Sequence, residues 1–157
     1  MEWRDVSGEF YCDGSWRDIC VLGTEIGHWQ RAIDKLRVST FQVRYARGGV
    51  DCALPVDAAE AFPEPGWADR LLSIDLGGVT VNSHFFEQTE IEFDLDPSEV
   101  RGQRELDSLV QFMHLLADAT GRDAILTPEN MTHIVVFRVR PNEACIEYTP
   151  FGGFSEV

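Results

Sequence analysis

Three features of the sequence predict an α+β fold. The stretch TEIEFDLDP, residues 89–97, alternates acidic and apolar residues, as a strand with one buried face does. Residues 24–37 and 104–121 repeat apolar residues at spacings of three and four, which is typical of amphipathic helices. Glycine pairs and an Asp-Gly mark tight turns elsewhere. We therefore expect a mostly antiparallel sheet of a meander and hairpins, with two amphipathic helices packed on one face.

In the first part of the chain, residues 9–22 predict a hairpin that turns at Asp13-Gly14. Thr24 can then cap the first helix, whose apolar stripe consists of Ile26, Trp29, Ile33 and Leu36. Residues 40–54 predict a second hairpin that turns at Gly48-Gly49. Residues 55–70 contain three prolines, which indicates a loop or a single helical turn.

The segment 71–96 predicts three consecutive strands. A two-residue turn at Gly77-Gly78 would pair Leu72 with Ser83, and a turn over residues 87–89 would then pair Phe85 with Ile91, Ser83 with Phe93 and Val81 with Leu95. All three apolar faces coincide in this register. The opposite face collects polar and aromatic side chains, with His84 facing Glu92 and Asn82 facing Asp94; its members are Ser73, Asp75, Thr80, Asn82, His84, Phe86, Glu90, Glu92 and Asp94.

In the last part of the chain, Asp96 can cap a helical turn that begins at Pro97, with Glu99 completing a capping box. The long helix ends at Gly121, residues 122–130 are expected to form a loop, and residues 133–149 predict a hairpin around Pro141-Asn142. The length of 157 residues fits a single domain, with residues 150–157 as a loose tail.

Acidic residues are concentrated in the middle of the chain. The net charge is −14, and residues 51–99 hold twelve Asp and Glu against Arg70 alone. A one-sided negative field repels the phosphates of nucleic acids and anionic membranes, and it attracts basic proteins and metal cations. The composition therefore disfavours direct binding to nucleic acid or to a membrane.

No apolar run reaches 18 residues and the N-terminus lacks a signal-peptide pattern, so we expect a cytoplasmic protein. Its four cysteines, Cys12, Cys20, Cys52 and Cys145, are then expected to be reduced, with most of them in the core. No nucleophile elbow, zinc-protease helix, dinucleotide-binding glycine motif or P-loop occurs, and no cofactor is expected.

Metal binding is one interpretation of the acidic segment. His84, Glu92 and Asp94 combine one imidazole with two carboxylates, a set that can hold a divalent transition ion with open positions. The alternative is a polar pair on a solvated sheet face, which arises readily in a segment this acidic.

Partner docking is the other interpretation. Trp67 and Phe86 fall beside the carboxylates, and an aromatic anchor with a charged rim is a common design for protein-binding surfaces. We therefore expect Asp75, His84, Phe86, Glu90, Glu92, Asp94 and Trp67 to dock a basic protein partner.

The stretches GSWRDICVL, HWQRAIDKLR, FFEQTEIEFDLDPSEV and ILTPEN resemble patterns of a family of small uncharacterised bacterial proteins, and the resemblance covers residues 14–130. It implies a shared fold and supplies no catalytic residues. In size and acidity the chain is also similar to immunity proteins, which neutralise a basic toxin such as a nuclease.

The function we expect is therefore a non-enzymatic, acidic protein-binding module, of the immunity or inhibitor type. A metal-dependent enzyme or metal-binding protein that uses His84, Glu92 and Asp94 is the alternative. Exposed edge strands could also pair two copies in a homodimer.

Overall fold

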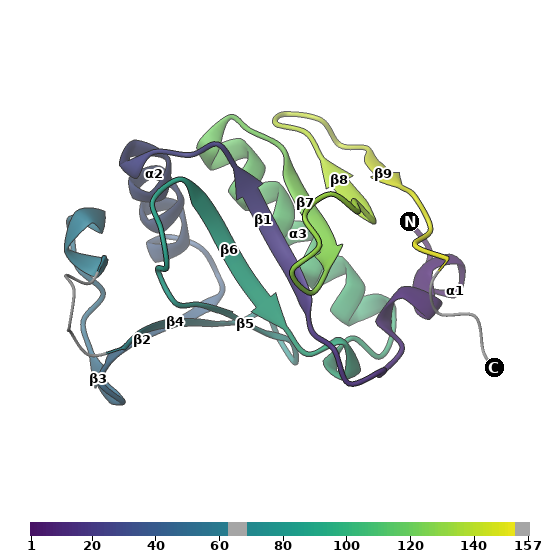
Figure 1. The fold of residues 1–157 in the computed structure, drawn as a ribbon, viewed down its shortest axis with the longest axis horizontal. Coiled ribbons are helices and arrows are strands. Elements are labelled where there is room, and N and C mark those ends of the chain that lie inside the picture. The colour runs from purple at the N-terminus through teal and green to yellow at the C-terminus, as the bar shows by residue number, and fades with distance from the viewer. Residues whose placement is uncertain (63–68, 153–157) are drawn as a thin grey trace.

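A computed structural model of the protein describes residues 1–62 and 69–152. These residues form one antiparallel sheet of nine strands, three α-helices and three short 3-10 helices, which confirms the predicted α+β class (Figure 1). The strands are β1 (Arg17–Leu22), β2 (Gln42–Arg47), β3 (Val50–Cys52), β4 (Arg70–Asp75), β5 (Thr80–Ser83), β6 (Glu90–Leu95), β7 (Ala124–Pro128), β8 (Phe137–Val139) and β9 (Ile146–Tyr148). The α-helices are α1 (Trp3–Val6), α2 (Ile26–Arg37) and α3 (Gln103–Thr120), and the 3-10 helices are η1 (Ser7–Phe10), η2 (Ala58–Ala61) and η3 (Pro97–Glu99).

The order of strands across the sheet is β3-β2-β4-β5-β6-β1-β7-β8-β9. The strand that comes first in the chain, β1, therefore lies in the interior of the sheet and pairs with β6 on one side and with β7 on the other. This long-range pairing joins the predicted meander to the C-terminal hairpin. It decides which side chains lie beside the acidic residues of β6.

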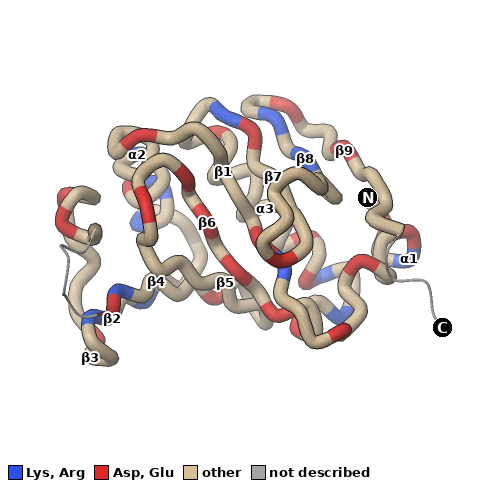
Figure 2. The backbone as a smooth tube through the Cα atoms, in the orientation of Figure 1, with Lys and Arg blue, Asp and Glu red and all other residues tan. Residues whose placement is uncertain are grey.

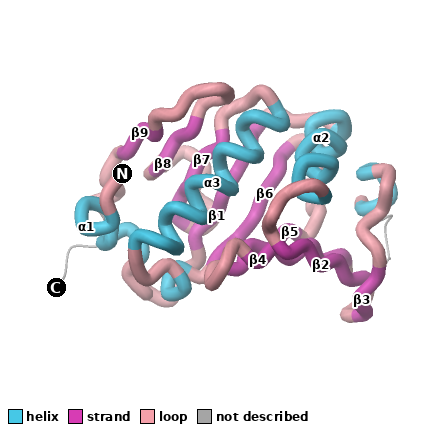
Figure 3. Tube along the Cα trace, turned by 180° about the vertical axis from the view of Figure 1, so that it is seen from behind, coloured by secondary structure: helices cyan, strands magenta, loops and turns pink. Residues whose placement is uncertain are grey.

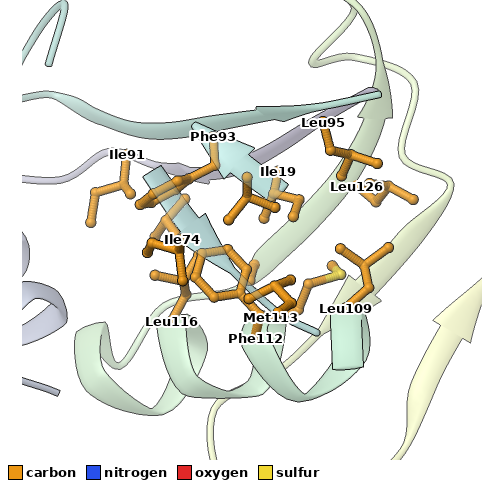
Figure 4. Packing of buried hydrophobic residues seen from close by; sticks show 14 of the residues in the cluster. Ile19, Ile74, Ile91, Phe93, Leu95, Leu109, Phe112, Met113, Leu116 and Leu126 are labelled. Atoms are coloured by element: carbon orange, nitrogen blue, oxygen red, sulfur yellow. The ribbon is translucent and has the colours of Figure 1, made fainter. Parts of the chain in front are cut away.

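Helices α2 and α3 cover one face of the sheet, as predicted (Figure 3). Their apolar stripes are buried against the sheet, and in α3 Leu109, Met113 and Leu116 lie among the residues that fill the core (Figure 4). Phe93 of β6 meets Phe112 of α3 edge to face, with 5.1 Å between ring centroids. On the opposite face of the sheet, the side chains of β4, β5 and β6 are half-buried or exposed, so we call this the open face.

The N-cap of α2 lies one residue later than predicted. Glu25 caps this helix, while the Thr24 hydroxyl donates a hydrogen bond to the carbonyl of Gln88 at 2.7 Å. Gly121 ends α3 with a φ of 67°, a left-handed conformation that favours glycine. Asp96 accepts a hydrogen bond from the Ser98 backbone and Pro97 follows it, as predicted. Glu99 does not complete the capping box, since its carboxylate accepts from the Thr80 backbone.

The predicted register of the meander is confirmed over its first half. Leu72 faces Ser83, Ile74 faces Val81, and the Leu76 N–H donates to the Val79 carbonyl across the Gly-Gly turn. Val81 and Asn82 face Leu95 and Asp94. The ladder then stops, because β5 ends at Ser83 and Phe85 adopts a φ of 54°.

The predicted hairpin over residues 9–22 is wrong in its first strand. Residues 3–10 form α1 and η1, and only β1 is a strand. Residues 9–16 form no strand that could pair with β1. The buried guanidinium of Arg17 instead donates hydrogen bonds to the backbone carbonyls of Glu9, Tyr11 and Trp16. Val6 and Phe10 pack into the core, which stabilises the helical turns.

The predicted loop over residues 122–130 is also wrong, since it contains the strand β7. All five residues of β7 are buried, and the strand pairs with β1 and β8. A strand covered on both faces shows no alternation of polar and apolar residues, so the periodicity could not identify it.

All four cysteines are free thiols, but only Cys20 is buried, so the expectation that most lie in the core is wrong.

The start of the predicted tail is anchored, because the Phe151 N–H donates to Glu9. Residues 153–157 lie outside the described part. In the described chain no helix has the length and apolar character needed to cross a membrane.

Candidate functional site

The acidic residues of β6 lie on the open face of the sheet. Ile91, Phe93 and Leu95 face the helices and are buried, whereas Glu90, Glu92 and Asp94 point the other way and are half-buried. Figure 2 shows acidic positions recurring along β6, which carries no Lys or Arg. The alternation in the sequence thus follows from the two faces of this strand.

Strand β1 adds two further side chains to this face. Asp18 lies directly opposite Asp94, and Cys20 lies directly opposite Glu92. Only 4% of Asp18 is exposed, and its Oδ2 accepts a hydrogen bond of 2.7 Å from the Asn130 N–H. Neither residue was predicted to belong to the site, because nothing local in the chain indicates that β1 pairs with β6.

These side chains line a groove of about 420 Å³. The segment that follows β7 forms one wall, and Glu129 in this wall accepts a hydrogen bond of 3.2 Å from the Trp16 N–H. None of the lining residues is a lysine or an arginine. They are Trp16, Asp18, Leu71, Asn82, His84, Glu92, Asp94, Glu129 and Asn130, a set that we call the acidic groove.

His84 differs from its predicted placement. It follows the end of β5, so it does not pair with Glu92, and its Nε2 lies 3.6 Å from the Asp94 carboxylate instead. Its ring stacks on that of Phe86, with 5.3 Å between centroids. Phe86 is 77% exposed, so it offers an apolar surface next to the acidic groove.

Three carboxylates of the acidic groove, those of Asp18, Glu92 and Asp94, have raised pKa values. Burial raises the pKa of Asp18 to about 6, against the hydrogen bond from Asn130, and the charges of Asp94, Glu129 and Glu90 raise it further. Burial also raises the pKa of Glu92 to about 7, with added repulsion from Asp18, Glu90 and Asp94. The pKa of Asp94 is raised by burial and lowered in part by His84.

The predicted metal ligands are only partly brought together. Among residues 1–62 and 69–152, the group of three potential ligands whose atoms lie within 4.8 Å of one another is Cys20, Glu90 and Glu92. His84 and Asp94 are neighbours, but they do not form such a group with Glu92. Burial, with the nearby charge of Glu90, strongly raises the pKa of the Cys20 thiol, so this sulfur is a neutral thiol near neutral pH.

The other residues predicted for docking are dispersed. Glu90 lies on the same strand face as Glu92, beyond the lining of the acidic groove. Asp75 lies at the end of β4, where its carboxylate accepts hydrogen bonds from the Gly77 and Gly78 backbone, so it orders the turn. Trp67 lies outside the described residues. Trp16, which the sequence analysis did not single out for docking, lines the acidic groove and is 43% exposed.

The fold and this site define an acidic α+β protein with a carboxylate-lined groove on its open sheet face. A scan with protein-family models matches none of them to the chain. Searches of curated proteins and of solved structures return no significant match either. The proposal below therefore rests on the groove itself.

Proposed function

We propose that this protein is a non-enzymatic binding module that docks a basic protein partner through the acidic groove. The observation that carries the proposal is the composition of the groove: four carboxylates, Asp18, Glu92, Asp94 and Glu129, and no lysine or arginine among the lining residues. The partner would insert a cationic side chain there. An immunity or inhibitor protein that occludes a basic toxin, such as a nuclease, is the specific form we favour.

The electrostatics of the acidic groove support the binding of a cationic partner. Burial and, after it, repulsion between the carboxylates raise the pKa values of Asp18 and Glu92, so the groove holds negative charge at an energetic cost. A cation that enters the groove lowers this cost and favours the ionised carboxylates. The net charge of −14 also steers a basic partner toward the protein over about a Debye length, ~8 Å at physiological salt.

The surroundings of the groove suit a protein partner. Trp16 and Phe86 are exposed aromatic side chains at its margin, and aromatic anchors beside charged groups are typical of protein-binding surfaces. Asn82 and Asn130 add amide groups that can hydrogen-bond to a polar ligand.

The test compares two double variants in a pull-down from the native host. Glu92→Gln with Asp94→Asn removes two charges from the groove, and Glu60→Gln with Glu143→Gln removes two charges from exposed positions outside it. We expect a basic partner that wild type and the control variant retain at low salt, and that the groove variant and high salt both release. Neutralising mutually repelling acids should stabilise the fold, so lost binding cannot be ascribed to unfolding.

Equal retention by the groove variant and the control variant would contradict the proposal. Metal binding is the alternative, favoured by the close approach of Cys20, Glu90 and Glu92. It predicts stoichiometric binding of Zn²⁺ or Mn²⁺ in calorimetry, abolished by Cys20→Ser with Glu90→Gln and unaffected by the control variant.

A further inference from the structure

A second pocket, about 420 Å³ in volume, lies on the open face of the sheet over β7 and β8. Ile125 of β7 faces Cys20 of β1 on one side and Arg138 of β8 on the other, and Cys20 belongs to the open face. Pockets of this volume accommodate small molecules. The residues described as lining this pocket are not shared with the acidic groove. Its apolar and charged lining residues define what we call the arginine pocket: Leu22, Ile125, Val135, Arg122, Asp123 and Arg138.

The charged side chains of the arginine pocket leave one positive charge without a counterion. Nη1 of Arg138 lies 2.7 Å from the Asp123 carboxylate, and Nε of Arg138 lies 3.8 Å from that of Glu147. Asp123 is therefore neutralised. Arg122 forms no ion pair with any carboxylate in the part of the chain that the structure describes. The arginine pocket is thus a locally positive site on a protein whose net charge is −14.

Contacts with the backbone fix the position of the Arg122 guanidinium. Its Nε donates a hydrogen bond of 2.7 Å to the Leu22 carbonyl. Its Nη2 lies against Gly23, where a Cβ atom would come within 2.6 Å of this nitrogen. Nη1 and Nη2 donate to no acceptor among residues 1–62 and 69–152. The two terminal nitrogens of Arg122 are therefore positioned in advance for the two oxygens of a ligand.

The end of α3 does not oppose the binding of an anion here. Gly121, which follows this helix, lines the arginine pocket, and the C-terminus of a helix carries partial negative charge. Arg31 of α2 offsets this charge, because its guanidinium donates to the carbonyls of Ala119 and Thr120 at 3.0 and 3.4 Å. These two carbonyl groups are thus already paired with a cation.

We propose that the arginine pocket binds a small organic carboxylate that has an apolar body. The carboxylate oxygens would accept hydrogen bonds from the terminal nitrogens of Arg122. The apolar body would cover Ile125, Val135 and the side chain of Leu22, which is 40% exposed. A singly charged carboxylate matches one unpaired arginine, whereas the acidic chain would repel a doubly charged phosphate more strongly. This site is independent of the acidic groove and takes a ligand of the opposite charge.

The experiment titrates the full chain with 3-phenylpropionate and follows the backbone amide signals of Gly121 and Thr132, two lining residues, by NMR. Acetate carries the carboxylate without the apolar body, and 3-phenylpropanamide carries the same body without the charge. We expect saturable shifts with 3-phenylpropionate and binding at least about 10-fold weaker for each of the other two compounds. This comparison uses the wild-type protein alone, so it does not depend on the folding of a variant.

Two variants that each remove one positive charge then locate the site. Arg122→Gln removes the proposed ligand-binding guanidinium and should weaken binding of 3-phenylpropionate at least about 10-fold. Arg104→Gln is the matched control, because Arg104 is 81% exposed at the start of α3 and does not line the pocket, and it should bind as wild type does. The proposal is overturned if acetate or the amide binds as tightly as 3-phenylpropionate, if 3-phenylpropionate causes no saturable shift, or if Arg122→Gln keeps the wild-type affinity.

Discussion

Asp18 and Asp94 lie directly opposite each other on β1 and β6, on the open face of the sheet. Carboxylates in such a pair repel each other, and burial raises the pKa of both. His84 reaches Asp94 at 3.6 Å, but no lysine or arginine lines the groove. A proton or a bound cation is therefore what relieves this repulsion. The first two predictions test these two ways of relief.

The stability of the protein should fall as the pH rises from about 4 to about 7. The pKa of Asp18 is raised from 3.8 to about 6 and that of Glu92 from 4.5 to about 7, so the folded state holds more protons than the unfolded state in this window. Raising the pH then favours unfolding. Each pKa unit corresponds to ~1.4 kcal/mol, so we expect Asp18 to account for a loss on the order of 2 kcal/mol. Urea unfolding at pH 4 and pH 7.5 measures this loss.

The control for this prediction is Asp18→Asn. Asparagine keeps the shape of the side chain and can still accept the Asn130 N–H bond, but it does not titrate. The variant should be more stable than wild type at pH 7.5 and should show a shallower dependence of stability on pH. The same slope in both proteins would mean that the burial of Asp18 does not govern this behaviour.

The second prediction concerns the cation that enters the groove. Arginine should bind better than lysine, because its planar guanidinium can stack on Trp16 while it donates to two carboxylates. We expect a peptide with a single arginine to bind several-fold tighter than the same peptide with lysine. NMR shifts of the side-chain amide of Asn82 report the binding. Equal affinities would indicate attraction by charge alone.

The sequence was informative where contacts are local. The turn at Gly77-Gly78 and the alternation of β6 placed Leu72, Ile74 and Val81 in their observed pairs, because each pairing follows from the turn length and one shared apolar face. The stripes of α2 and α3 were identified for the same reason, since helical periodicity is written in neighbouring residues.

The sequence was uninformative where the site depends on distant pairing. Asp18 and Asn130 are 112 positions apart, and they meet only because β1 inserts between β6 and β7. The strand β7 was missed because it is buried on both faces. His84 was misplaced because Phe85 leaves the ladder with a positive φ, which a bulky residue adopts rarely and no pattern indicates. The groove is thus a product of the strand order.

The third prediction concerns the hydrogen bond that joins β9, near the C-terminus, to η1, near the N-terminus. The Tyr148 hydroxyl donates a hydrogen bond of 2.9 Å to the Glu9 carboxylate, whose other oxygen is buried and has no hydrogen-bond partner among the described residues. Tyr148→Phe should leave the Phe151 N–H as the remaining described donor to this buried carboxylate and destabilise the protein by ~1–3 kcal/mol. Chemical denaturation measures the loss. The double variant Tyr148→Phe with Glu9→Gln should lose less than the sum of the two single changes if the residues act as a pair.

The last prediction concerns Arg17, which connects the N-terminal helical turns to β1. Its side chain is only 2% exposed and donates to the carbonyls of Glu9, Tyr11 and Trp16, to the Ser15 hydroxyl and, at 3.5 Å, to Asp13. Lysine has one donor group where arginine has three nitrogens in a fixed plane, so it cannot reach all of these acceptors at once. Arg17→Lys should therefore leave buried carbonyls unsatisfied and destabilise the protein by ~2–4 kcal/mol.

Two measurements locate the effect of Arg17→Lys. Chemical denaturation gives the loss of stability, and hydrogen exchange shows where it arises, because amides of residues 3–12 should exchange faster while those of α3 keep a protection that reflects global unfolding. Arg44→Lys is the matched control, since Arg44 is exposed and such surface changes usually alter stability by less than ~0.5 kcal/mol. A loss for Arg17→Lys as small as that of the control would show that water replaces the guanidinium in this role, and that α1 and η1 are held by the packing of Val6 and Phe10 instead.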